Sequence, residues 1–324
     1  MDNFIFSINA TVPIFLVIIL GYILKRLKII NKAFVDTANK YVFKVALPVM
    51  LFKDLAFSEV IADINGKFII FCIAVTITMF ILAWFLSYAL LKDKTMVGAF
   101  AQGSVRSSAA ILGVAFVENI CGDSGMAPLM IASAVPFFNV LSVVILTFSA
   151  EYNNSNDSSS SGKDKIKKDI IKSLKGIITN PIIIGIFSGL IFAASRLPMP
   201  IIPMKTINLI SVTATPIALI AIGGGFEFKL ALTRIKPAIV ASLIKLCILP
   251  IVFLPLALIC GFRNSELVAI LIMLASPTTV SCFIMAKEMD NDEVLTSNIV
   301  VLTTIFSSVT LTIWIFILKT MGYI

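Results

Sequence analysis

Histidine is absent from this sequence of 324 residues, and charged residues make up only 14% of it. The lack of histidine excludes histidine-based metal sites and histidine general bases. The five cysteines are odd in number, and they lie mostly within apolar runs without metal-ligand or disulfide spacing (Cys72, Cys121, Cys247, Cys260 and Cys282). We therefore predict no metal centre and no cofactor.

Acidic residues are missing from the middle of every long apolar run. Asp54, Glu118, Glu227 and Glu288 all fall near the ends of predicted helices. A carboxylate proton relay, or a sodium site built on carboxylates, would have little to work with, so a coupled H⁺ or Na⁺ would need hydroxyl and carbonyl oxygens. The same scarcity leaves a membrane enzyme without a base, a nucleophile or a metal cluster, and we predict that the chain is not an enzyme.

Apolar residues dominate what is present: 59% of the chain is hydrophobic and the mean hydropathy is +1.03. Soluble domains average about 45–50% apolar residues, so the composition predicts an all-α polytopic membrane protein. Met1-Asp2-Asn3 carries no basic region, and we expect no cleaved signal peptide. The net charge of +8 comes from cations in short loops, which positive-inside topology explains better than binding to nucleic acid.

We count ten apolar runs as membrane-spanning helices. They cover residues 8–27, 36–57, 67–91, 97–119, 125–149, 181–194, 205–226, 233–260, 267–286 and 294–318. Most loop lysines and arginines fall on one side when both termini are placed outside the cell. A polar stretch and a basic amphipathic segment over 163–175, typical of a helix on an anionic lipid surface, separate the two halves.

The two halves resemble each other in the spacing of prolines and glycines. Pairs recur 168 positions apart: Pro13 with Pro181, Gly21 with Gly189, and Pro48 with Pro216. Five spans per half is an odd number, so the second copy must be inverted in the membrane. We predict a first five-helix repeat over 1–149, a cytoplasmic linker over 150–176, and a second, inverted repeat over 177–324.

The ninth run contains a proline among hydroxyl side chains at mid-depth. A proline inside a helix breaks it, and irregular backbone in a membrane survives only where protein or a cavity surrounds it. A shift of 169 positions sets this stretch against a small, hydroxyl-rich stretch of the fourth run. We predict that the fourth and ninth helices are both broken and cross at the substrate site; plain close packing of small residues is the alternative. The candidate residues are Ser104, Ser107, Ser108, Ser276, Pro277, Thr278, Thr279 and Ser281.

Arg106 and Lys245 each lie about ten residues inside a predicted span. Charges at that depth are costly and usually mark a pathway or a partner, so both are candidates to attract an anionic substrate. The alternative is that they snorkel or satisfy backbone carbonyls freed near Pro250 and Pro277. Asn139 is a further candidate to line the cavity, although an asparagine in a span is more often an interhelical hydrogen bond.

Several motifs, in order, resemble the auxin efflux carrier family over nearly the whole chain. They are Val12-Pro13-Ile14-Phe15 with Gly21-Tyr22, Ala46-Leu47-Pro48 with Leu51-Phe52, Thr215-Pro216-Ile217-Ala218-Leu219 with Ile222-Gly223, Lys245-Leu246 with Pro250, and Ser276-Pro277-Thr278-Thr279-Val280-Ser281 with Ala286-Lys287-Glu288. Ser108 and Ala115 depart from the asparagine and proline that relatives often have.

The resemblance implies a bacterial inner-membrane carrier of ten helices that works as an elevator and forms a homodimer. It also implies small organic anions as substrates, auxin-like or dicarboxylic acids. The alternatives are a sodium-coupled symporter of organic anions of the bile-acid-transporter type, which shares the inverted-repeat plan, and a receptor that binds an anion without moving it.

Overall fold

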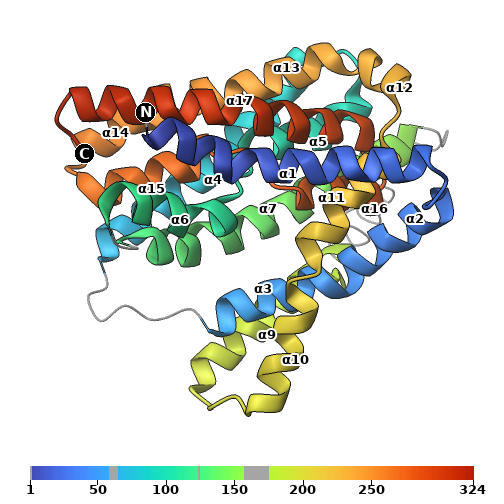
Figure 1. Ribbon diagram of the computed structural model, residues 1–324, viewed down its shortest axis with the longest axis horizontal. Coiled ribbons are helices and arrows are strands. Elements are labelled where there is room, and N and C mark those ends of the chain that lie inside the picture. The colour runs from blue at the N-terminus through green and yellow to red at the C-terminus, as the bar shows by residue number, and fades with distance from the viewer. Residues whose placement is uncertain (1, 58–64, 123–124, 157–174) are drawn as a thin grey trace, which may run out of the picture.

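The computed structural model describes residues 2–57, 65–122, 125–156 and 175–324 (Figure 1). Every regular element in these ranges is a helix and none is a strand, so the predicted all-α class is confirmed for the described chain. The stretch 157–174, which contains most of the predicted linker and its basic helix, lies outside the described residues.

The first half of the chain contains three long helices, α1, α4 and α7, and several shorter pieces. In order these are α1 (Asp2–Arg26), α2 (Lys32–Tyr41), η1 (Val42–Ala46), α3 (Leu47–Ala56), α4 (Gly66–Leu90), η2 (Lys94–Met96), α5 (Val97–Val105), α6 (Ala109–Cys121) and α7 (Ala127–Asn156).

The second half follows a similar order of elements. It comprises α9 (Pro181–Ser195), α10 (Ile201–Ser211), α11 (Ala214–Gly225), α12 (Phe228–Thr233), α13 (Ile235–Leu243), η3 (Ile244–Ile248), α14 (Leu249–Ile259), α15 (Asn264–Ala275), α16 (Ser281–Glu288) and α17 (Glu293–Thr320).

Two of the expected spans contain a wide π-helical turn that the sequence analysis did not predict. The turns η1 and η3 end immediately before Leu47-Pro48 and Leu249-Pro250, and each proline lies in the first turn of the next helix. A proline has no N–H to give to the preceding turn and its ring collides with it. A wider turn relieves this clash, and such single π turns are frequent at functional sites.

Five helical stretches of the described residues are long and apolar enough to cross a membrane. They are Gly66–Leu90, Ala127–Ala150, Ile201–Gly225, Ile235–Ile259 and Glu293–Thr320. The shorter helices Pro181–Ser195 and Asn264–Ala275 are also apolar. Together with the composition, these helices make the chain a membrane protein.

Two helix pairs come into close backbone contact at glycines. A Cβ added to Gly21 of α1 would lie 2.5 Å from the Ile220 carbonyl oxygen of α11, and one added to Gly189 of α9 would lie 2.8 Å from the Phe52 carbonyl oxygen of α3. Only glycine permits such an approach between membrane helices. Gly21 and Gly189 are 168 positions apart, as are Phe52 and Ile220, so the spacing found in the sequence reappears in the contacts.

Candidate functional site: the crossing of two interrupted helices

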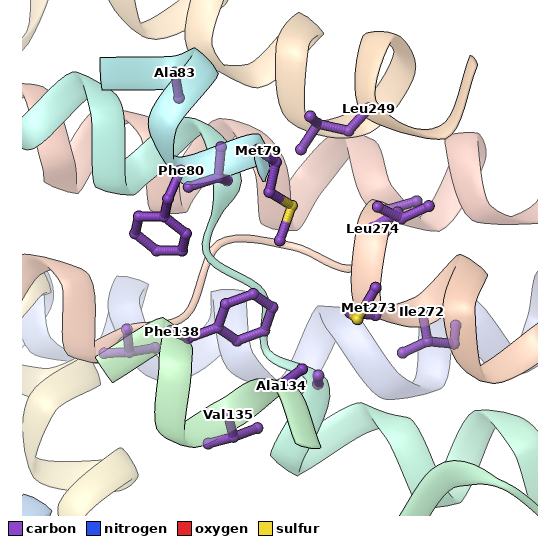
Figure 2. Close-up of a cluster of buried hydrophobic side chains, with 14 of the residues drawn as sticks. Met79, Phe80, Ala83, Ala134, Val135, Phe138, Leu249, Ile272, Met273 and Leu274 are labelled. Carbon is purple, nitrogen blue, oxygen red and sulfur yellow. The ribbon is translucent and has the colours of Figure 1, made fainter. Parts of the chain in front are cut away.

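The fourth and ninth predicted spans are each interrupted near their middle. Helix α5 ends at Val105 and α6 begins at Ala109, while α15 ends at Ala275 and α16 begins at Ser281. The two non-helical segments touch, because the Ser108 N–H donates to the Pro277 carbonyl oxygen at 2.9 Å. Figure 2 shows the segments passing each other as thin ribbons beside Met79, Phe138 and Met273.

The backbone groups released by the two interruptions find partners within the crossing. The Thr278 hydroxyl donates to the Gly103 carbonyl oxygen at 2.7 Å, and the Thr278 N–H donates to the Thr303 hydroxyl at 3.0 Å. The Gln102 amide donates to the Cys282 carbonyl oxygen at 3.0 Å. Buried backbone groups without partners would destabilise the fold, so these side chains stabilise the irregular backbone at this depth.

Arg106 lies in the first of the two segments, with only 3% of its surface exposed. Its guanidinium donates to the Asn139 side-chain oxygen at 2.5 Å and to the Ser281 hydroxyl at 2.9 Å, and it contacts the Met285 sulfur at 2.6 Å. All three partners are neutral, and no ion pair joins Arg106 to a carboxylate of the described residues. Its Nε–H has no hydrogen-bond partner in the structure. Arg106 is therefore a buried cation that lacks a counter-ion in the described chain.

A cavity of about 40 Å³ lies beside the Arg106 guanidinium, between the crossing and helices α3, α7 and α11. A buried water needs roughly 10–15 Å³, so this space holds about three waters or one carboxylate group. The apolar lining residues are Leu47, Met50, Leu51, Val135, Phe138, Ala214, Ala218 and Val280. The polar lining residues are Asp54, Arg106, Ser107, Ser108, Asn139, Thr215, Thr279 and Ser281.

Two helices begin at this cavity without a side-chain cap. Neither Ser108, before α6, nor Val280, before α16, provides a side-chain hydrogen bond to the first turn of its helix. The N-terminus of a helix carries a partial positive charge and unpaired N–H groups. Both features add to the positive potential that Arg106 gives the cavity.

The predicted site residues divide into two groups in the structure. Those that line the cavity are Arg106, Ser107, Ser108, Asn139, Thr279 and Ser281; those that do not are Ser104, Lys245, Ser276, Pro277 and Thr278. Except for Lys245, members of the second group belong to the two interrupted spans. The Ser104 hydroxyl donates to the Ala101 carbonyl oxygen of its own helix at 3.1 Å, and the Ser276 hydroxyl is buried without a partner.

Lys245 is fully buried behind the crossing, and it contacts backbone oxygens at the ends of α5 and α15. Its ammonium lies 3.0 Å from the Val105 carbonyl oxygen and 2.6 Å from that of Leu274. This is the second of the two arrangements that the sequence left open, in which the lysine satisfies carbonyls freed by the interruptions. For Asn139 the sequence left two alternatives, cavity lining and a hydrogen bond between helices. The structure shows both, because Asn139 lines the cavity and its side-chain oxygen also accepts a hydrogen bond from Arg106.

Asp54 is an ionisable lining residue that the sequence analysis did not select. Its position near the end of a predicted span suggested a loop-side location, but the structure places it on the cavity wall. Leu47, Leu51 and Asp54 are spaced at i, i+4 and i+7, which is one face of helix α3. That spacing is the signal in the sequence that could have identified Asp54 once Leu47 was assigned to the wall.

Ion pairs tie the polar ends of several helices together. Lys287 at the end of α16 lies 3.1 Å from Asp36 of α2 and 3.1 Å from Glu293 of α17. Arg234 lies 2.8 Å from Asp292 and 3.4 Å from Asp93. The pKa of the Asp93 carboxyl is lowered, first because the Thr95 hydroxyl donates to it and also because Arg234 is near.

Comparison with known sequences identifies the family of the chain. A family profile described as "membrane transport protein" matches residues 6–315. The chain belongs to this family, which is that of the auxin efflux carriers. The resemblance drawn from the sequence motifs is thereby confirmed.

Members of the family from bacteria and archaea are similar to the chain over most of its length. An "uncharacterized transporter" of Methanothermobacter thermautotrophicus is 24% identical, with 96% of this chain and 98% of the relative covered. The "uncharacterized transporter YfdV" of Escherichia coli is 24% identical over 87% of this chain and 88% of its own. The "uncharacterized transporter MJ1031" of Methanocaldococcus jannaschii is 21% identical over 96% and 98%.

Proposed function

We propose that this membrane transport protein is a secondary carrier of a small organic carboxylate, which binds in the cavity beside Arg106. The observation that carries the proposal is the guanidinium itself: it is buried, it lines a cavity, and its partners are neutral. A buried cation is stable only when paired or hydrogen-bonded, and its free Nε–H can donate to one more acceptor. A substrate carboxylate supplies both the missing charge and the missing acceptor.

The cavity walls narrow the class of acid. Arg106 is the one cation and Asp54 the one carboxyl group among the described lining residues, and eight of the lining residues are apolar. A dicarboxylate would place its second charge near Asp54 or against apolar side chains, and neither stabilises it. We therefore favour a monocarboxylate over malate- or malonate-type acids.

The proposed carrier has ten spanning helices in two inverted five-helix repeats. The constant spacing of 168 positions in the glycine contacts supports this arrangement, as do the interruptions in the fourth and ninth spans. In this scheme α1, α2, α3, α9, α10 and α11 form a scaffold. The remaining helices carry the cavity across the inner membrane as an elevator, the carrier forms a homodimer, and both termini face outside.

Flux into proteoliposomes tests the proposal. Purified protein is reconstituted and offered labelled indole-3-acetate, short aliphatic monocarboxylates, malate and malonate, with sodium and pH gradients imposed separately. We expect saturable uptake of a monocarboxylate that fails in the Arg106→Gln variant. Binding of an acid without flux would favour a receptor, and dependence on a sodium gradient would favour the bile-acid-type symporter.

A further inference from the structure

Lys245 is a buried cation that the proposed substrate site does not use. It lies in the wide turn η3, with none of its surface exposed. Its ammonium donates to the Val105 carbonyl oxygen at 3.0 Å, to the Leu274 carbonyl oxygen at 2.6 Å and to the Ser107 hydroxyl, and it lies 3.4 Å from the Met273 carbonyl oxygen. The shell is built of carbonyl and hydroxyl oxygens, and no ion pair links Lys245 to a carboxylate in the described ranges.

The hydrogen bonds around Lys245 match its charged form. The Ser107 hydroxyl donates its own hydrogen to the Met273 carbonyl oxygen, so it can only accept from Lys245. Val105 and Leu274 contribute carbonyls, which also only accept. Three close acceptors match the three N–H groups of an ammonium, whereas a neutral amine would turn its lone pair toward an oxygen.

The ends of two helices explain why a cation belongs at this point. Helix α5 ends at Val105 and α15 ends at Ala275, so two C-termini meet at the Lys245 ammonium. Each C-terminus leaves carbonyls without intrahelical partners and carries a partial negative charge. In carriers with interrupted helices, such C-terminal ends and unwound carbonyls are the groups that hold a coupling sodium ion or proton.

We propose that the Lys245 ammonium fills a monovalent-cation site at the crossing, so the carrier needs no dissolved cation there. Lys245 is thus a positioning residue, which holds α5 and α15 together beneath the substrate cavity. The consequence for transport, that no dissolved cation is needed at this site, rests on the proposed function. The binding of the cation itself is a property of the folded chain.

The other half of the chain supplies a matched control. The shift of 169 positions that relates the two interruptions places Thr76 of α4 opposite Lys245. The Thr76 hydroxyl is buried and contacts only the Met273 sulfur, at 3.9 Å. Thr76→Val therefore changes a buried polar residue at the equivalent position without removing a cation.

The test is the melting temperature of the purified full-length protein in salts of equal ionic strength. The cations are N-methyl-D-glucamine, which is too large for the site, sodium, potassium and ammonium. We expect the wild type and Thr76→Val to melt at the same temperature in all four salts. Lys245→Ala should melt lower in N-methyl-D-glucamine and recover by about 3 °C in a small cation at ten times its Kd. Lys245→Met fills the space without charge and should melt lower in every salt, without recovery.

Three results would overturn the proposal. The first is selective stabilisation of the wild type by sodium or potassium, which would mean that a dissolved cation still binds. The second is a Lys245→Ala variant that melts like the wild type in N-methyl-D-glucamine or gains nothing from small cations. The third is failure of Lys245→Ala to fold in any salt, since a small cation should then replace the ammonium. No organic acid takes part in these measurements, so a carrier that moves none of the acids tested would leave this inference intact.

Discussion

Replacing Arg106 by glutamine distinguishes two possible roles of this residue: binding of an anion and support of the fold. The change removes up to three hydrogen bonds to a charged group, each worth about 1.5–3 kcal/mol. It also removes a buried charge that lacks a counter-ion in the described chain, and the desolvation penalty of such a charge is several kcal/mol. The two effects are similar in size and opposite in sign. We therefore expect the free energy of unfolding to change by less than about 2 kcal/mol.

Binding of the substrate should respond far more strongly than stability. Removing one partner of a buried, hydrogen-bonded charge pair costs about 2–5 kcal/mol of binding free energy. A central value of 3–4 kcal/mol corresponds to a Kd raised roughly 150- to 700-fold. The assay is binding of the transported acid to purified protein, measured beside the melting temperature of the same sample.

Ser142→Ala is the matched control for this prediction. Ser142 lies on α7, three residues after Asn139, and its buried hydroxyl has no partner in the structure and does not line the cavity. We expect its removal to leave Kd unchanged. The reasoning would be refuted if Arg106→Gln bound the acid within tenfold of the wild type while its melting temperature fell by more than about 8 °C.

Three further changes test other parts of the structure. Pro277→Ala restores an N–H where the ninth span is interrupted, and we expect flux to fall at least tenfold with the yield of folded protein unchanged. Asp54→Asn removes the carboxyl group on the cavity wall; because an ionised Asp54 repels an anion, the variant should bind the acid more tightly than the wild type in the same binding assay. Gly21→Ala places a Cβ 2.5 Å from a backbone oxygen and should destabilise the fold by about 1–3 kcal/mol in thermal unfolding, whereas Gly66→Ala meets nothing within 4 Å and should not.

The sequence predicts the interruptions of the helices better than their exact form. Pro277 among hydroxyl side chains indicates the ninth-span interruption directly, because proline cannot continue a helix hydrogen-bond ladder. The interruption at Arg106 has no proline, and only the repeat identifies its place. The wide turns before Pro48 and Pro250 depend on how the chain relieves the clash of each ring, which helical periodicity does not encode.

The sequence predicts which residues lie at the candidate site better than it predicts which of them line the cavity. Depth within a span marks both Arg106 and Lys245 as functional cations, yet only Arg106 lines the cavity. What separates them is the direction of two side chains at one crossing, and that direction follows from tertiary packing between α5, α15 and η3. Asp54 escaped selection because distance from the middle of a predicted span does not show whether a residue lines a cavity.

The ion pairs of Lys287 have a consequence for the speed of the proposed transport cycle. Asp36 belongs to α2 of the proposed scaffold, whereas Glu293 begins α17 in the same proposed moving unit as Lys287. A displacement of α16 past α2 breaks the first contact and keeps the second, so the lysine retains a counter-ion throughout. The Lys287–Asp36 ion pair can therefore open without leaving Lys287 unpaired, and dissolved salt screens the half-exposed Asp36 carboxylate. In the proposed cycle, we therefore expect higher ionic strength to shorten the time that the carrier spends in this conformation.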